Sequence, residues 1–199
     1  MSGRSPRWIS EIKRGGLPSG YTQLEYIQSS GAQYIDTGFK PNQNTVVRAD
    51  MAHYLSSETC WIFGARNGTN VGAFGFLTYR SFYRADYGTA TTNLSRTPTK
   101  RFVIEMDKNV AKVDGAVVAT ATVQTFSTNY PIYLFANNNA GSAAGFSPTQ
   151  IYGCEIYNGD ILMREFIPCR RNSDNALGMY DTVHGTFYQN AGSGAFIGG

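Results

Sequence analysis

The chain has 199 residues, of which 42% are hydrophobic, only 16% are charged and 22 are glycine. This size suits one large β-sandwich or two small domains, and the shortage of charge together with abundant Gly, Tyr, Thr and Asn favours strands joined by tight turns. The formal net charge is +3, and because residues 1–20 hold four basic side chains against one acidic, the remainder is neutral. A neutral body lacks the basic surface that binding to a phosphate backbone requires, so we expect no nucleic-acid partner.

The first predicted element is a basic arm, residues 1–20, which ends in a Gly-, Pro- and Ser-rich run at residues 15–20. Residues 6–13 are the best helical candidate of the chain, but at most two turns are too short to be stable alone. The arm carries apolar side chains that a solvated tail would not need, although a solvated tail stays an alternative. We predict that it docks on a neighbouring subunit through Arg4, Arg7, Trp8, Ile9, Ile12, Lys13 and Arg14.

Nothing at the start of the chain predicts export. The first twenty residues contain no apolar run of even five residues, and no stretch approaches the length of a membrane span. We therefore expect a protein that is made in a cytoplasm, is not exported by the usual route and does not contact a membrane.

Residues 45–51 and 101–107 alternate between apolar and other side chains, which is the pattern of a half-buried strand. One face of each carries the apolar residues Val47, Ala49 and Met51 in the first segment and Phe102, Ile104 and Met106 in the second.

Residues 61–87 are rich in aromatic side chains interleaved with Arg and Asn. On apolar strand patterns, Trp61, Phe63, Phe74 and Phe76 are interpreted as core. The polar, turn-rich stretch that follows is expected to be exposed, and aromatic faces there could stack on sugar rings while Arg and Asn bind hydroxyl groups. A second polar segment, residues 137–142, is expected to be a mobile loop. The candidate ligand-binding residues are Arg66, Asn67, Tyr79, Arg80, Tyr83, Arg84, Tyr87, Asn137 and Asn138.

Turn residues divide the rest of the chain into short strands. Residues 107–109 and 114–115 have the composition of hairpin turns, with strands at 110–113 and 116–123, and further strands are predicted at 131–135, 150–157 and 160–167, the last two joined at 158–159. We predict ten to thirteen strands in an all-β, two-sheet antiparallel sandwich at residues 21–199, preceded by the arm at residues 1–20.

No catalytic motif is present. His53 and His184 are interpreted as a surface and a turn histidine, and Cys60, Cys154 and Cys169 as buried free thiols. The one strand that begins like the two-carboxylate site of sandwich glucanases is Glu105-Met106-Asp107, but the second glutamate is absent. We therefore predict a protein that is not an enzyme and has no catalytic residue and no metal site.

Distinctive motifs lie at both ends of the domain. The opening set is Leu17-Pro18-Ser19-Gly20-Tyr21, Leu24-Glu25-Tyr26-Ile27 and Ser30-Gly31-Ala32-Gln33-Tyr34-Ile35-Asp36-Thr37-Gly38. The closing set is Phe166-Ile167-Pro168-Cys169-Arg170, Gly178-Met179-Tyr180-Asp181, Gly185-Thr186-Phe187-Tyr188 and Asn190-Ala191-Gly192-Ser193-Gly194. Together with the hairpin at Val113-Asp114-Gly115, they resemble the laminin G-like, concanavalin A-like lectin-type domains of phage tail-fibre and virion surface proteins.

The resemblance implies a jelly roll whose first and last segments pair, displayed on a phage or prophage particle. From it we expect an adhesion module that is oligomeric in the particle, contacts other virion structural proteins through the arm and binds host-surface or mucosal carbohydrate. A purely structural capsid or tail decoration protein is the alternative, and a glycoside hydrolase a weaker one. Some relatives bind Ca²⁺, but no aspartate cluster here specifies a site, so no cofactor is expected.

Overall fold

The computed structural model describes residues 16–53, 57–95 and 100–199, which form nineteen strands and no helix. Within this part of the chain no helix could therefore span a membrane. The all-β class is confirmed, but the predicted number of strands was too low because seven strands have only two or three residues. The helical candidate at residues 6–13 lies outside the described residues, as do the predicted docking residues Arg4, Arg7, Trp8, Ile9, Ile12, Lys13 and Arg14.

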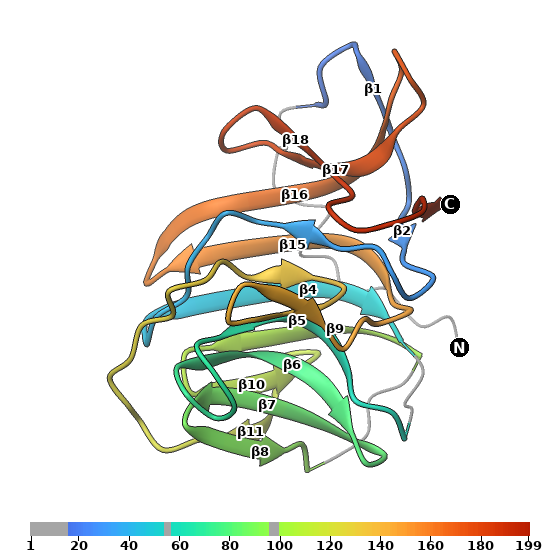
Figure 1. Cartoon of the computed structure of the whole chain (residues 1–199). Helices are drawn as coiled ribbons and strands as arrows, with labels where there is room; N and C mark the ends of the chain where they lie inside the picture. The colour runs from blue at the N-terminus through green and yellow to red at the C-terminus, as the bar shows by residue number, and fades with distance from the viewer. Residues whose placement is uncertain (1–15, 54–56, 96–99) are drawn as a thin grey trace, which may run out of the picture.

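The strands form two stacked sheets, which we call sheet A and sheet B (Figure 1). Sheet A has the order β11-β10-β9-β4-β15-β16-β17-β18, with β1 beside β16 and β2 between β15 and β19. Its strands are β1 (Tyr21–Gln23), β2 (Ile27–Gln28), β4 (Thr45–Ala52), β9 (Arg101–Asp107), β10 (Val110–Val113), β11 (Ala116–Thr120), β15 (Gln150–Asn158), β16 (Ile161–Arg171), β17 (Leu177–Asp181), β18 (Thr186–Gln189) and β19 (Ile197–Gly198).

Sheet B has the order β14-β13-β5-β6-β7-β8, with β12 joining β5 to β3. Its strands are β3 (Ile35–Asp36), β5 (Cys60–Arg66), β6 (Ala73–Tyr79), β7 (Phe82–Gly88), β8 (Ala90–Asn93), β12 (Tyr133–Leu134), β13 (Asn137–Asn139) and β14 (Ser142–Ala144). All of the strand pairs are antiparallel except β13 with β5. In Figure 1 strands β5 to β8 overlie strands β9 to β11, and the inner faces of the two sheets meet because buried side chains from both sets of strands form one cluster.

The core lies between these inner faces. As the alternation predicted, the apolar residues of β4 and β9 are buried there, and they share one cluster with Phe63, Phe74 and Phe76 of sheet B. Such interdigitation of two inner faces is what a sandwich requires. Trp61 is also buried but lies outside this cluster, because a bulge between Trp61 and Phe63 turns its indole to the other face of sheet B.

The two ends of the domain are joined in sheet A. Strand β19 pairs with β2 and strand β1 with β16, while Phe196, just before β19, packs its ring 5.0 Å from that of Phe135. The backbone of Glu25 also donates a hydrogen bond to the carbonyl of Gly199 at 2.6 Å. First and last segments therefore complete the same sheet.

Candidate functional site on the outer face of sheet B

The nine predicted ligand-binding residues do not form one surface. Tyr83 and Tyr87 are buried on the inner face, where Tyr83 stacks on Phe76 with ring centroids 5.4 Å apart and donates a hydrogen bond to the carbonyl of His53 at 3.2 Å. Their predicted exposure was wrong, because the chain after Tyr79 is strand β7 and not a polar loop. The period-two spacing of Tyr83, Ala85 and Tyr87 was the signal for this.

The structure of residues 137–142 also differs from the prediction. Asn137–Asn139 is strand β13, paired with β5, so the predicted mobile loop is wrong. Asn138 is buried, and its side chain donates to the carbonyl of Pro131 at 3.1 Å and accepts from the amide of Gly141 at 2.9 Å. These bonds fix the turn between β13 and β14, and Asn138 is therefore a structural residue.

Asn67 is a second structural residue among the candidates. Its side-chain amide donates to the carbonyl of Ser127 at 3.0 Å and accepts from the backbone of Asn129 at 2.8 Å. Asn67 thus ties the end of β5 to the loop before β12.

Arg66, Tyr79 and Arg84 come together on the outer face of sheet B. Phe74 and Phe76 point into the core, so their neighbours Gly75, Leu77 and Tyr79 project outward, and Arg84 and Asp86 of β7 lie opposite Leu77 and Gly75. The outer-face site is defined here by Trp61, Arg66, Tyr79, Arg84, Asp86, Asn137 and Asn139.

Trp61 forms the floor of the outer-face site. A Cβ atom on Gly64 or Gly75 would lie 2.5 Å or 2.7 Å from the indole ring, so the ring rests on two residues that have no side chain. The Trp61 side chain is 3% exposed, and the guanidinium carbon of Arg66 is 5.5 Å from the centre of its ring. The sequence interpretation of Trp61 as a buried residue is confirmed, although its burial belongs to this surface and not to the core between the sheets.

Of the two arginines in the outer-face site, Arg84 forms an ion pair and Arg66 bonds to a neutral side chain. Arg84 binds Asp86 through Nε–Oδ1 and Nη2–Oδ2 contacts of 2.8 Å and 3.1 Å. Burial raises the pKa of the Asp86 carboxyl, against the attraction of Arg84. Arg66 donates from Nε to Oδ1 of Asn139 at 2.9 Å, and burial lowers the pKa of its guanidinium.

The hairpin between β6 and β7 extends this site toward solvent. The Tyr79 ring has the guanidinium carbons of Arg80 and Arg84 at 5.1 Å and 4.6 Å from its centre. Arg80 is exposed at the tip, where Arg80 and Ser81 have φ values of 49° and 66°, and the next residue, Phe82, is 52% exposed. Positive φ at both positions is typical of the type I′ turn that joins adjacent strands.

An aromatic pair continues the outer face beyond Gly64. Tyr133 lies opposite both Gly64 and Asp36, and its ring centroid is 4.4 Å from that of Tyr34. Burial, Asp36 and Tyr34 together raise the pKa of Tyr133 to about 12. The sequence interpretation did not include these tyrosines, because only the pairing of β3, β12 and β5 brings them beside the site.

The outer face of sheet A carries an open pocket of about 270 Å³, lined by Val46, Arg48, Glu105, Asp107, Tyr157, Gly159 and Asp160. It contains the Glu105-Met106-Asp107 strand. Arg48 donates to Glu105 from Nε at 2.7 Å, and the Lys112 ammonium contacts Glu105 at 2.7 Å and Asp107 at 3.1 Å. Burial alone would raise the pKa of Glu105, but the bonds from Lys112 and Arg48 lower it.

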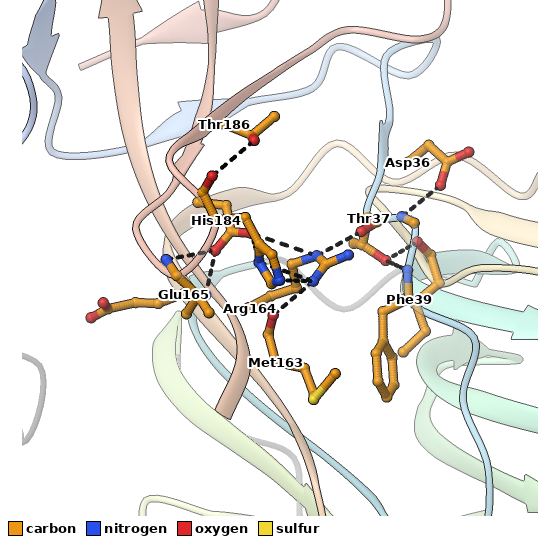
Figure 2. A network of polar contacts seen from close by, with 12 residues as sticks. Asp36, Thr37, Phe39, Met163, Arg164, Glu165, His184 and Thr186 are labelled. Carbon is orange, nitrogen blue, oxygen red and sulfur yellow. Dashed lines mark hydrogen bonds and ion pairs between the residues drawn. The ribbon is translucent and has the colours of Figure 1, made fainter. Parts of the chain in front are cut away.

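His184 lies in the turn after β17, as predicted, and joins the polar network of Figure 2. Its Nδ1 is 2.8 Å from Oδ2 of Asp181, and Arg164 lies beside the ring with Nη1 at 3.1 Å. Arg164 also donates to the carbonyls of Thr37 and Met163 at 3.0 Å and 2.8 Å. The network holds the β17–β18 turn against β16 and the chain after β3.

His53 is buried, so the prediction of a surface histidine was wrong. Its Nδ1 lies 2.9 Å from Oγ1 of Thr149 and 3.4 Å from Oγ of Ser147. Burial lowers the pKa of His53 to about 4, and the ring is therefore neutral at physiological pH.

The described residues contain no group of three or more His, Cys, Asp or Glu side chains that could hold a metal ion. Cys60, Cys154 and Cys169 are free thiols, the last two buried as expected and Cys60 half-buried. Neither a scan against protein-family models nor a search of curated proteins finds a match to the chain.

Proposed function

We propose that the chain is a non-enzymatic bacteriophage virion surface protein, a lectin-like jelly-roll module that binds host-surface or mucosal glycans through the outer-face site of sheet B. The observation that carries the proposal is the grouping of a half-buried Tyr79 ring with Arg66, Arg84 and Asn139 on one rigid sheet. Aromatic faces pack on the apolar side of a sugar ring, and guanidinium and amide groups bind its hydroxyls.

The state of the glucanase-like strand supports a non-catalytic function. A two-carboxylate mechanism needs one carboxyl group that is protonated and acts as the general acid. Here Arg48 and Lys112 favour the ionised form of Glu105, and Lys112 also neutralises Asp107. The net result is a lowered pKa of Glu105, which is the wrong direction for a general acid.

The pairing of the terminal segments supports the jelly-roll topology and, through the resemblance, the setting on a virion. In this proposal the basic arm contacts other virion proteins, the module is made in the bacterial host cytoplasm, and the outer face of sheet B points away from the particle. A structural decoration protein without a ligand is the competing function.

Binding of the purified full chain to a glycan array tests the proposal. Tyr79→Ala should reduce capture of the bound glycans by about tenfold, because a ring that stacks on a sugar is lost. Tyr152→Ala is the matched control: Tyr152 is also half-buried with a guanidinium over its ring, that of Arg101 at 3.5 Å, but it lies on β15 of sheet A. Equal loss in both variants would place binding elsewhere, and capture of no glycan by the wild-type chain would favour the decoration protein.

A further inference from the structure

Arg66 is the cation of the outer-face site that forms no ion pair in the described part of the chain, although Asp86, already paired with Arg84, attracts it from beyond contact distance. Arg84 is paired with Asp86, whereas among the described residues no carboxylate lies within ion-pair distance of Arg66, whose side-chain hydrogen bond goes to the neutral amide of Asn139. The three charges of Arg66, Arg84 and Asp86 therefore sum to +1. A guanidinium that is partly desolvated and packed over an indole needs an anion more than an exposed one does, and burial indeed lowers its pKa.

Asn137 adds a buried polar group that lacks a hydrogen-bond partner. Its side chain is 0% exposed, and neither the amide nitrogen nor the amide oxygen has a hydrogen-bond partner in the structure. Asn137 lies opposite Gly64 in the same pairing that places Asn139 opposite Arg66, so the two asparagines share the outer face. Buried polar groups are nearly always hydrogen-bonded, and an amide that is not is a candidate for binding a ligand.

We infer that the outer-face site selects acidic sugars, those that carry a carboxylate or sulfate group, and that Arg66, on the same face as the unpartnered Asn137, binds the anionic group. This inference rests on the proposed function. A guanidinium binds two oxygens of such a group through parallel N–H donors, which a neutral hydroxyl cannot match. Trp61 below Arg66 limits the directions that its guanidinium can take, because the side chain cannot fold down onto the sheet.

The test is an array on which each neutral sugar is printed beside its acidic forms: glucose with glucuronic acid and glucose 6-sulfate, galactose with galacturonic acid and galactose 6-sulfate. The wild-type chain should bind at least one acidic form about 10- to 100-fold better than the neutral parent. Arg66→Gln should reduce that ratio to about one. Arg66→Lys should keep part of it, since the charge remains but the paired donors do not.

Arg170→Gln is the matched control, because it removes an exposed arginine from β16 on sheet A. It should leave the ratio unchanged, and thermal unfolding of each variant establishes that it is folded. Whether the uronic acid or the sulfated sugar binds better identifies which anionic group the site accepts. Capture of neutral and acidic sugars alike, or a preference that survives in Arg66→Gln, would overturn this inference and leave the proposed function standing. Capture of no sugar would overturn both.

Discussion

His53 couples the stability of the core to pH. Its ring is buried beside Ser147 and Thr149, and the pKa is about 4 instead of about 6.5, the ordinary value. Below pH 6.5 the unfolded chain binds a proton that the folded chain does not, so the free energy of unfolding falls as the pH falls toward 4. Between pH 7 and pH 5 this single group accounts for a loss of about 2 kcal/mol.

Urea unfolding at pH 7 and pH 5 measures this loss. His53→Gln should remove most of the difference between the two values, whatever its effect on stability at pH 7. His184→Gln is the comparison variant, because it removes the other histidine, which lies in the turn after β17 beside Asp181, and the part of the loss that His53 causes should persist in it. An undiminished difference in His53→Gln would show that other groups cause the acid sensitivity.

Single residues were predicted well where alternation was strict and badly where a turn was misjudged. Val47, Ala49 and Met51 are buried because nothing interrupts the period along β4. Tyr83 and Tyr87 were predicted to be exposed because the turn at Arg80 and Ser81 uses residues that rarely adopt positive φ. Composition near a turn does not reveal which side of the next strand faces the core.

At the scale of the element, close contact between β5 and β6 determines where Trp61 lies. A Cβ atom on Gly75 would approach the Phe63 carbonyl oxygen to 2.5 Å and the Gly64 Cα to 2.8 Å, both backbone atoms that cannot move freely. We expect Gly75→Ala to destabilise the fold by about 2–3 kcal/mol and to displace the indole from the outer-face site.

Denaturant unfolding, together with Trp fluorescence in the folded state, measures both effects. Gly153→Ala is the matched strand variant, because the nearest atom to its new Cβ, the Phe166 carbonyl oxygen, would be 3.6 Å away. Its effect should stay within about 1 kcal/mol. Equal stability of the two variants would mean that the β5–β6 contact is looser than described.

The sequence predicted the strands that alternate over several residues and the turns that contain typical turn residues. Strands β9 and β10 have the predicted bounds. Asp114 and Gly115 form the expected turn between β10 and β11, with φ values of 49° and 80°. Strand β12 lies within the predicted strand at residues 131–135, but the other two- and three-residue strands were not predicted, because their pairing depends on distant partners: β3 pairs with β12, and β13 with β5. Tyr133 and Asn139 were missed for the same reason, because they are far in sequence from β5, with which they pair. Arg66, Tyr79 and Arg84 were predicted from composition alone.

At the scale of the whole molecule, the arm and the sandwich are expected to act separately. If, as proposed, residues 1–16 of the basic arm anchor the module in a virion, deleting them should abolish incorporation into particles while glycan capture and thermal unfolding of the remaining domain stay unchanged. Comparing the amount of wild-type and truncated chain in purified particles measures the effect. Equal incorporation would refute the anchoring role of the arm.

The joining of β2 to β19 also constrains how the molecule is made. Strand β2 obtains its two neighbours from β15 and β19, so a ribosome must synthesise the chain as far as β19 before this part of sheet A can close. Until then the emerging chain exposes unpaired strand edges and the apolar residues that Phe196 will later cover. Nascent chains are therefore vulnerable to aggregation throughout translation, and chaperones that bind exposed apolar segments should raise the yield of folded protein.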